Sequence, residues 1–519
     1  SLNIYFCIFQ SLKIPKLSKF SVKNYILSFM MQKRIHNIEE FCMNPIKTQE
    51  KVFKKLILKG KNTKFGKEHH FNQITKYSNF KNNIPVRTYE EFSKYIQRSR
   101  NGEQNVVWPG KIKWFSKSSG TTNAQSKFIP VTDESLKECH FKGGKDMLSL
   151  YGNNFPFSDM YNGKGLMLGG SLKNSEEGDY KDGDLSAILL DEFPFWVNYH
   201  RVPDIHTALM EDWENKLERI AQQAVKENIT NLTGVPSWML ILLKRVLLIS
   251  GKKNISEVWP KLELYMHGGI NFEPYKDQFK ALIPSKKMNY LEGYNASEGF
   301  IAIQDKSPSE GLLLMLDYGI FYEFIPMKNF KKGILETTNL KDVELNTNYA
   351  LVISTNGGLW RYLIGDIICF TNLSPFRVKI IGRTKSFLNT FGEELVIDNT
   401  DKALIEVCKK HQASIKDYTV APIFINNGSG GHQWLIEFSK EPQDIQGFKL
   451  DLDKSLQDLN SDYAAKRSKN LLLNMPDIIL IKNNEFYLWL KKNKRLGGQY
   501  KIPRLSNDRK FVEEIIALL

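Results

Sequence analysis

The chain has 519 residues, of which 42% are hydrophobic, 25% charged and 12% aromatic. This composition is ordinary for a folded globular protein and argues against disorder, and the length favours two or more domains. The formal charge is +15, and the sequence pI is near 9.2. Because the lysines are scattered rather than clustered in one run, the charge does not indicate a nucleic-acid-binding surface, and we expect no nucleic-acid partner.

The cysteines and the N-terminal residues bear on the cellular compartment. Five widely spaced cysteines include no C-x-x-C pair: Cys7, Cys42, Cys139, Cys369 and Cys408. An odd number of distant cysteines argues against a disulfide framework and against a zinc site. The opening apolar run is too short for a membrane span, and no small-residue cleavage site follows it. We therefore expect a cytoplasmic protein with no membrane partner, and a monomer is favoured.

Three regions follow one another along the chain. Residues 21–104 are predicted to be mostly helical, because apolar positions recur near a helical period and Pro85 interrupts them only once. Residues 105–383 alternate β-rich runs, such as SKFIPV and YALVIS, with helical stretches, such as residues 205–227. This alternation predicts an α/β domain whose sheets are covered by helices. The polar, Gly-rich stretch 169–184 is expected to be a surface loop.

The pattern changes again after residue 384. A helix, DKALIEVCKKH, precedes two strands, YTVAPIFINN and HQWLIEFSK, which the turn signal GSGG joins. Another helix, the run PDIILIKNNEFYLWL and a Gly-containing loop follow. The sequence thus predicts an α/β protein, with a large domain over 1–384 and a smaller, mobile α+β domain over 385–519.

The stretch WFSKSSGTTNAQSKFIPVT places a cluster of hydroxyl groups between two predicted strands. It contains Ser118, Ser119, Gly120, Thr121 and Thr122, and Lys127 follows. Such a cluster can surround phosphate oxygens with donors and little steric bulk. It has neither the spacing of a P-loop nor the helix that follows one. Taken alone, the run is also compatible with a plain hairpin turn.

Two further segments carry candidate ligand-binding residues. In MHGGINFEPY, Gly268 and Gly269 end a predicted strand and would let a flat ligand approach the backbone. In LEGYNASEGF, Tyr294 can stack on a purine ring and Glu298 can offer a carboxylate to Mg²⁺. Proteins hold Mg²⁺ with one or two carboxylates together with substrate phosphates. The Y-x-x-x-E spacing is common by chance and assigns nothing alone.

Three charged residues complete the candidate site. Asp366 follows a glycine in WRYLIGDIICF, and its carboxylate can accept hydrogen bonds from ribose hydroxyls, although a turn aspartate is the alternative. Arg383 in IGRTK can contact the ribose or a phosphate. Lys501 in GGQYKIPR lies in a loop, where a lysine is more often simply solvated.

The order of these segments resembles the adenylate-forming superfamily, which includes acyl-CoA synthetases, luciferases and the adenylation domains of peptide synthetases. Within it, the chain is similar to the auxin-responsive Gretchen Hagen family of acyl acid–amido synthetases. The resemblance runs from about residue 21 to the C-terminus. It rests on PIKTQEKVFKKLILKGKNTKFGKEHHF, VWPGKIKWFSKSSGTT, HGGINFEPY, YNASEGF, WRYLIGD, GRTKSFLNTFGEEL and QYKIPR.

The resemblance implies a role for each matching residue. The expected ATP-binding residues are Ser118, Ser119, Gly120, Thr121, Thr122, Lys127, Gly268, Gly269, Tyr294, Ser297, Asp366 and Arg383. Glu298 is expected to bind Mg²⁺ and, with Lys501 of the small domain, to act in catalysis; the hinge is expected near Lys385. Two positions depart from the family pattern, Ala124 in place of glycine and Trp360 in place of tyrosine.

The activity that the resemblance implies is a two-step ligation that uses ATP and Mg²⁺. A small carboxylic acid would be adenylated with release of pyrophosphate, and the acyl group would then pass to an amine, expected to be an amino acid. Two alternatives remain open. One is an acyl-CoA synthetase that forms a thioester, and the other is a non-catalytic ligand-binding protein on the same scaffold.

The sequence does not identify the acid. Four aromatic residues are candidates to line an acyl pocket, with core packing as the alternative: Phe193, Phe195, Trp196 and Tyr199. Three histidines are candidate general bases, with a structural role as the preferred alternative: His140, His200 and His267.

Overall fold

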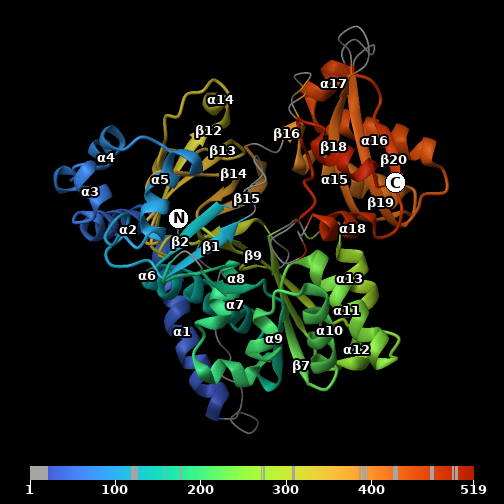
Figure 1. Ribbon diagram of the computed structural model, residues 1–519, viewed down its shortest axis with the longest axis horizontal. Coiled ribbons are helices and arrows are strands. Elements are labelled where there is room, and N and C mark those ends of the chain that lie inside the picture. Colours follow the sequence, from blue (N-terminus) through green and yellow to red (C-terminus); the bar gives the residue numbers. More distant parts are fainter. Residues whose placement is uncertain are drawn as a thin grey trace, which may run out of the picture.

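The structure is a computed structural model. It describes residues 22–118, 127–156, 158–175, 178–269, 272, 275–306, 310–384, 387–388, 390, 393, 395–424, 430–467, 473–493, 496 and 501–518. The chain forms a helical N-terminal region, a large region of sheets and helices, and a smaller C-terminal region of both (Figure 1). The predicted α/β fold class is confirmed.

Helices make up most of the N-terminal region. They are α1 (Val22–Met43), α2 (Pro45–Gly60), α3 (Lys64–Glu68), α4 (Tyr77–Asn83), α5 (Tyr89–Arg100) and the 3₁₀ turn η2 (Phe71–Gln73). Pro45 suits the first turn of α2, where its fixed φ is already helical. The face of α2 that carries Phe53, Leu56 and Ile57 is buried. No helix among the described residues is long and apolar enough to cross a bilayer.

A mixed sheet of eleven strands, counted over the described residues, forms the centre of the molecule. Its order is β12-β13-β14-β15-β11-β10-β9-β8-β7-β3-β6. The strands are β3 (Lys164–Met167), β6 (Arg201–Val202), β7 (Ile229–Thr233), β8 (Leu264–Gly268), β9 (Asn289–Ala296), β10 (Gly299–Ile303), β11 (Leu312–Leu314), β12 (Ile320–Pro326), β13 (Asn348–Thr355), β14 (Tyr362–Leu373) and β15 (Phe376–Arg383). The pairs from β6 to β9 are parallel. Because the carboxyl ends of parallel strands meet at one edge, residues that follow β7 and β8 lie together there.

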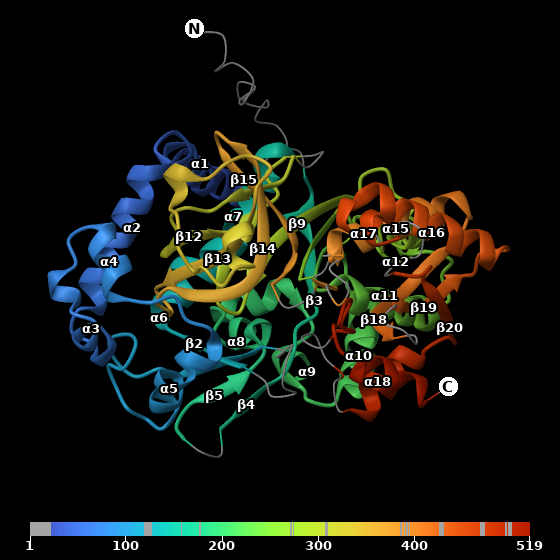
Figure 2. The same cartoon turned by 90° about the horizontal axis from the view of Figure 1, so that it is seen from above.

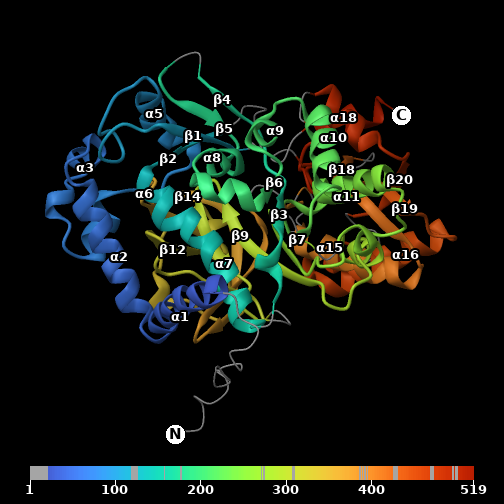
Figure 3. The same ribbon diagram turned by 90° about the horizontal axis from the view of Figure 1, so that it is seen from below.

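Helices between the strands lie around this sheet (Figures 2 and 3). The longer ones are α7 (Phe141–Asn154), α10 (Trp213–Ala224) and α11 (Pro236–Ser250). The shorter ones are α6 (Asp133–Ser135), η3 (Leu136–His140), η4 (Met160–Asn162), α8 (Leu185–Asp191), η5 (Phe195–His200), α9 (Ile205–Leu209), α12 (Ile255–Val258), α13 (Lys276–Leu282), α14 (Met327–Phe330) and η7 (Leu340–Asp342). The helical stretch predicted over 205–227 is thus two helices, because Asp212 caps α10 by accepting a hydrogen bond from the backbone N–H of Asn215 at 3.1 Å.

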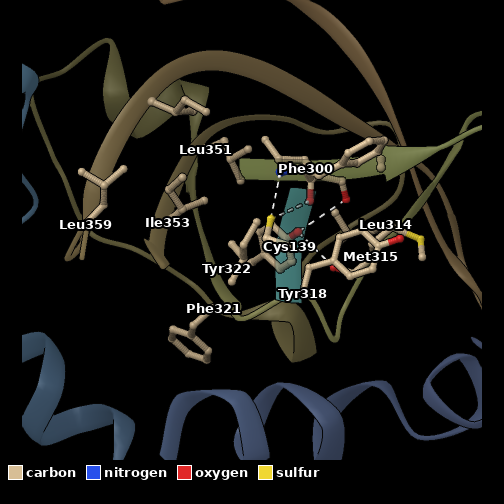
Figure 4. Close-up of a cluster of buried hydrophobic side chains, with 14 of the residues drawn as sticks. Cys139, Phe300, Leu314, Met315, Tyr318, Phe321, Tyr322, Leu351, Ile353 and Leu359 are labelled. Atoms are coloured by element: carbon tan, nitrogen blue, oxygen red, sulfur yellow. Dashed lines mark hydrogen bonds between the residues drawn. The ribbon is translucent and has the colours of Figure 1, made fainter. Parts of the chain in front are cut away.

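The core around β10 and β12 contains buried polar groups that form hydrogen bonds with one another (Figure 4). The backbone N–H of Phe300 donates to the Cys139 sulfur at 3.2 Å, and the Tyr322 hydroxyl donates to the Met315 carbonyl at 3.0 Å. Burial raises the pKa of the Cys139 thiol to about 12. This cysteine therefore stays protonated and acts as a packing residue.

A second, four-stranded sheet lies beside the first and has the order β2-β1-β5-β4. Its strands are β1 (Trp114–Ser118), β2 (Lys127–Val131), β4 (Leu172–Asn174) and β5 (Lys181–Gly183). The stretch 169–184 is therefore not the loop that its composition predicts. β4 and β5 pair with each other, and β5 also pairs with β1. Gly183 permits this pairing, because a Cβ there would lie 2.5 Å from the Ser171 carbonyl oxygen.

The C-terminal region contains the three-stranded sheet β18-β19-β20. Its elements are β16 (Phe387–Leu388), β17 (Leu395–Val396), α15 (Ile397–Lys410), β18 (Ser414–Phe424), β19 (Gly430–Lys440), α16 (Ile445–Leu459), α17 (Ser461–Arg467), β20 (Asp477–Ile481), α18 (Glu485–Lys492) and α19 (Lys510–Ile516). The predicted order of helices and strands is confirmed. The domain boundary at 384–385 remains a prediction, and Lys385 lies outside the described residues.

The C-terminal region rests on α10, α11 and α13 of the large region (Figures 1 and 3). Lys491 of α18 forms an ion pair with Glu214 of α10 at 2.7 Å, and the Tyr487 hydroxyl donates to the same carboxylate at 3.1 Å. The Gln278 side chain of α13 donates to the Ile415 carbonyl at 3.1 Å. One apolar cluster also includes residues from both regions. These contacts join the start of β18 and helix α18 to helices of the large region.

Candidate active site

A cavity of about 2620 Å³ lies at the carboxyl ends of β7 and β8, and the C-terminal region forms part of its wall. Single ligand pockets are usually about 300–1,000 Å³, so this cavity has room for more than one substrate. The predicted site residues that line it are Ser118, Gly268, Gly269, Tyr294, Ser297, Glu298, Asp366, Arg383 and Lys501. Positions that are far apart in the sequence therefore meet around one space.

Asp366 is the centre of a hydrogen-bonded group at this cavity. The Tyr294 hydroxyl donates to Asp366 Oδ2 at 2.5 Å, and Arg383 Nε donates to Asp366 Oδ1 at 2.9 Å. Asp366 lies within β14, directly opposite Arg383 of β15, so it is not a turn residue. Gly365 precedes it with φ of +93°, a left-handed conformation that glycine adopts without strain. Each carboxylate oxygen retains a lone pair that can accept from a ligand hydroxyl.

Tyr294 is 6% exposed and lies at the end of β9. Burial, followed by the negative charge of Asp366, raises the pKa of Tyr294 well above its usual value. The phenol therefore remains protonated and keeps donating its hydrogen bond. Its predicted stacking on a purine remains a prediction.

Ser297 and Glu298 form the two-residue turn between β9 and β10. The Ser116 hydroxyl of β1 donates to the Ser297 hydroxyl at 3.0 Å, which ties this turn to the second sheet. Glu298 is 8% exposed, and burial raises its pKa, while the positive charges of Lys127 and Arg383 oppose that rise. A cation bound beside this buried carboxylate would stabilise its charged form.

The donor set around Glu298 bears on which metal ion fits. No cluster of three or more His, Cys, Asp or Glu side chains suited to a metal occurs in the part of the chain that the structure describes. An ion at Glu298 would therefore take most of its ligands from a bound substrate and from water. This arrangement fits Mg²⁺, which is commonly held by one or two carboxylates and substrate phosphates.

The hydroxyl-rich segment has the strand context that its sequence predicts. β1 and β2 pair as antiparallel neighbours, with Ser118 opposite Lys127. A P-loop, which opens a helix, is therefore excluded. Lys127 does not line the cavity, and its ammonium nitrogen lies 5.4 Å from the centre of the Tyr89 ring. Five residues that the sequence analysis named in this segment lie outside the described residues: Ser119, Gly120, Thr121, Thr122 and Ala124.

Gly268, the last residue of β8, and Gly269, which follows it, have different functions. Gly268 pairs with Gly293 of β9, and a Cβ at Gly268 would lie 2.2 Å from the Gly293 carbonyl oxygen. Its lack of a side chain thus allows close approach of a neighbouring strand rather than of a ligand, which corrects the reason expected from the sequence. Gly269 has φ of +81°, and its carbonyl accepts a hydrogen bond from the Lys501 ammonium.

Lys501 reaches this site from the C-terminal region. Its side chain is accessible from the cavity, yet protein surrounds it closely enough that desolvation lowers its pKa to about 8. The positive charges of Arg383 and Arg504 lower the pKa further, and the negative charge of Asp366 raises it. Lys501 therefore shares its electrostatic surroundings with Asp366 and Arg383.

Two residues near the site were not singled out from the sequence, Tyr275 and Arg504. Both line the cavity, and Arg504 Nη2 donates to the Tyr275 hydroxyl at 2.9 Å. The sequence signal for Arg504 was its position in the QYKIPR block that contains Lys501.

Trp360, where the family pattern has tyrosine, belongs to the core. Its indole N–H donates to the Val107 carbonyl at 3.0 Å, and its side chain is fully buried. The next residue, Arg361, forms a buried ion pair with Glu323 at 3.0 Å. Neither Trp360 nor Arg361 lines the cavity, so this departure affects packing rather than the site.

The expected aromatic acyl pocket is only partly formed. Phe193 lines the cavity and stacks on Phe141, with ring centres 5.4 Å apart. Phe195 and Tyr199 are 77% and 72% exposed and do not line it. The Trp196 side chain lies outside the described residues. Phe195 and Tyr199, which are exposed on η5, are therefore no longer candidates to line the acyl pocket.

The three candidate histidines all line the cavity. Burial lowers the pKa of His140 to about 4 and that of His267 to about 3. Both rings are therefore neutral near pH 7. His140 Nδ1 lies 3.2 Å from Asn295 Oδ1, and the His267 ring stacks on Phe272 with centres 4.1 Å apart. These contacts agree with structural roles; His200 is exposed.

Comparison with known proteins identifies the family. Models of the GH3 family match the chain as its N-terminal domain over residues 34–288, its central domain over 313–383 and its C-terminal domain over 398–510. Indole-3-acetic acid-amido synthetase GH3.4 of Arabidopsis thaliana is 25% identical over 72% of each chain. Jasmonoyl–L-amino acid synthetase JAR6 of Nicotiana attenuata is 24% identical over 94% of this chain and 95% of its own.

Solved structures agree on the fold. The acyl acid amido synthetase AtGH3.15, in complex with 2,4-DB, superposes with a TM-score of 0.78 at 17% identity over 97% of both chains. A 2-hydroxyisobutyryl-CoA ligase in its postadenylation state gives a TM-score of 0.60 at 11% identity over 91% of both chains. Because the three domain models together span most of the sequence, and their order follows the structure described above, the chain belongs to the GH3 family.

Proposed function

We propose that this protein is an ATP-dependent ligase that joins a small carboxylic acid to an amino acid through an acyl-adenylate. One observation carries the proposal. The hydrogen-bonded group of Tyr294, Asp366 and Arg383 shares a cavity with Lys501, which comes from the C-terminal region. The names of the relatives, which are amido synthetases for indole-3-acetic acid and jasmonate, support an amide as the product.

ATP is the proposed nucleotide. Asp366 is placed to accept hydrogen bonds from ribose hydroxyls, and Tyr294 to contact the base. The hydroxyl-rich segment that follows Ser118 in the sequence is the proposed phosphate site, with Arg383 contributing positive charge. Backbone and hydroxyl donors suit phosphate oxygens because they bring little steric bulk.

Adenylation joins two anions, and that is its main obstacle. A carboxylate oxygen of the acid attacks the α-phosphorus, the bond from this phosphorus to the bridging oxygen breaks, and pyrophosphate leaves with the electron pair. Preorganised cations and hydrogen-bond donors lower such a barrier, and removing one of them lowers the rate by a factor of about 10²–10³. Lys501, held at the Gly269 carbonyl, supplies such a charge from the C-terminal region.

Amide formation consumes the adenylate. The amine nitrogen attacks the acyl carbon, the bond from this carbon to the phosphate oxygen breaks, AMP leaves, and the nitrogen loses a proton to solvent. The amine needs access to the acyl carbon, so Lys501 and its loop are proposed to withdraw after the first step by movement of the small domain.

Mg²⁺ is the proposed metal ion, with Glu298 as its protein ligand. When bound, it would neutralise phosphate charge. We expect Glu298→Ala to raise the Mg²⁺ concentration needed for half-maximal pyrophosphate exchange by about tenfold, because the only acidic ligand offered by the turn is lost. Titration of Mg²⁺ at saturating ATP measures this shift. A titration identical to that of the wild-type enzyme would contradict the assignment.

A screen of pyrophosphate release tests the function. Aromatic and aliphatic acids are crossed with the common amino acids, and products are identified by mass. Acid-dependent exchange between ATP and pyrophosphate, followed by amide formation, is the expected result. A thioester formed with coenzyme A in place of an amide would indicate an acyl-CoA synthetase, and no turnover with any acid would indicate a ligand-binding protein.

The proposed location is the cytoplasm. The cysteines in the described residues, Cys42, Cys139, Cys369 and Cys408, are all unpaired, as is usual in a reducing compartment.

A further inference from the structure

The segment 501–506 brings two basic side chains to the cavity while it is attached to the sheet of the C-terminal region. The backbone N–H of Val420 in β18 donates to the Arg504 carbonyl at 2.9 Å, and the N–H of Ser506 donates to the Val420 carbonyl at 3.0 Å. The Thr419 hydroxyl also donates to the Pro503 carbonyl at 2.5 Å. Any contact that fixes this segment against the large domain therefore also fixes the backbone that carries Lys501.

Arg504 makes such a contact. Its Nη1 donates to the Asp417 carboxylate and to the Tyr418 carbonyl, the latter at 3.2 Å, and its guanidinium lies 4.4 Å from the centre of the Tyr418 ring. These partners belong to the C-terminal region. Its Nη2 donates to the Tyr275 hydroxyl at 2.9 Å, and Tyr275 belongs to the large region, where it is 3% exposed. One planar guanidinium therefore joins the two regions.

The acceptors on the large region lie close together in the sequence. The Gly269 carbonyl accepts from Lys501, and the Tyr275 hydroxyl accepts from Arg504. The backbone N–H of Tyr275 donates to the Phe272 carbonyl at 2.9 Å, which helps to hold the segment after β8 in place. The two basic residues thus bind one short stretch between β8 and α13.

We propose that Arg504 is a positioning residue, which through Tyr275 holds the segment 501–506 in the arrangement that places Lys501 for adenylation. The inference rests on the proposed function. Lysine has a flexible stem and one compact charge, so its own hydrogen bond orients it weakly. Arginine has a rigid fork of donors, which can bind acceptors on both regions at once. Breaking the contact to Tyr275 releases the segment for the amine step.

Tyr275→Phe isolates this contact, because it removes one hydroxyl and keeps the buried ring. The loss of a hydrogen bond to a charged group costs enough free energy to change a rate about tenfold or more. We expect kcat of acid-dependent ATP–pyrophosphate exchange to fall about tenfold, with little change in KM for ATP or acid. Amide formation from a synthetic acyl-adenylate and an amino acid should keep its rate or become faster. Arg504→Lys should show the same pattern of rates, because a lysine ammonium cannot replace the fork of donors on the guanidinium.

Tyr290→Phe is the matched control. Tyr290 packs against the same hydrophobic cluster as Tyr275, with its ring centre 5.0 Å from that of Phe272, and its hydroxyl has no hydrogen-bond partner within the described part of the chain. This variant should leave both half-reactions unchanged.

Three results separate the possible outcomes. Unchanged exchange in Tyr275→Phe would overturn the positioning role, and so would an equal loss in both half-reactions together with a lower Tm, because that pattern indicates a merely structural residue. If the wild-type enzyme itself showed no exchange with any acid, the proposed function would fail first.

Discussion

At the scale of single residues, the site depends on charges placed where water is scarce. The charges of Asp366 and Arg383 act on the pKa of Glu298 and on the pKa of Lys501, which comes from another region. The Asp366 carboxylate offsets part of the repulsion between Arg383 and Lys501.

The ionisation of Lys501 gives a prediction about pH. Its pKa of about 8 lies below the usual lysine value, so the ammonium is charged below pH 8 and loses its charge as the pH rises through that value. We expect kcat/KM for ATP in acid-dependent exchange, which reports the free enzyme, to fall above pH 8. Lys501→Ala should lower exchange at least about tenfold at pH 7.

Lys501→Arg serves as the control in that experiment, because a guanidinium stays protonated throughout the range. Whatever activity this variant retains should not decline above pH 8. A decline at the same pH in both enzymes would assign the titration to another group.

At the scale of elements, the site depends on close contact between β8 and β9. The Gly268–Gly293 pair lets the two strands approach at the point where β9 leads to Tyr294 and the Glu298 turn. β14 and β15 present Asp366 and Arg383 from directly opposite positions. Neighbouring strands of one sheet thus set the relative positions of the nucleotide-binding candidates.

Gly268→Ala tests the strand contact. The added Cβ would lie 2.2 Å from a backbone oxygen, so β8 and β9 would have to separate. Overpacking of this kind costs about 1–3 kcal/mol, and we expect the free energy of unfolding to fall by that amount and pyrophosphate exchange to fall with it. Denaturant titration and exchange assays measure the two effects.

Gly144→Ala is the matched substitution in helix α7. No heavy atom lies within 4 Å of the Cβ that it adds, so it should stabilise the protein by about 0.5–1 kcal/mol. A Gly268→Ala protein as stable as the wild type would show that the strands separate without cost.

At the scale of the whole molecule, the two regions share one cavity and one apolar cluster, and polar contacts join their edges. The exposed Lys491–Glu214 pair contributes little to stability, because water screens it. The contacts of Lys501 and Arg504 are different, since they connect the regions at the site itself. The formal charge of +15 adds a long-range attraction for anionic substrates.

Salt should therefore weaken capture of ATP. Raising the ionic strength from about 0.01 M to about 0.15 M shortens the Debye length from about 30 Å to about 8 Å. We expect kcat/KM for ATP to fall severalfold over this range while kcat changes little, because screening acts on encounter rather than on the closed site. A neutral osmolyte at matched osmolarity is the control, and a salt-independent kcat/KM would contradict the prediction.

Much of the molecule could be predicted from local sequence patterns. Alternating β-rich and helical runs predicted the α/β class, whereas the segments around Ser118, Tyr294, Asp366 and Lys501 pointed to one site only through their shared resemblance to a known family. Local patterns were wrong for the stretch 169–184, because its strands are defined by pairing with β1 rather than by their own composition. They were also uninformative about Phe195 and Tyr199, because an aromatic side chain on η5 can face either solvent or the cavity.

By itself, the sequence determined which chemical groups were available and in which order along the chain, because residue type and local periodicity are properties of short segments. Only the tertiary structure decided which of them meet. The Tyr294 hydroxyl donates to Asp366, the Gly269 carbonyl accepts from Lys501, and Arg504 donates to the Tyr275 hydroxyl. These contacts join positions far apart in the chain, and they depend on strand order and on how the C-terminal region rests on the large sheet, neither of which a short segment specifies.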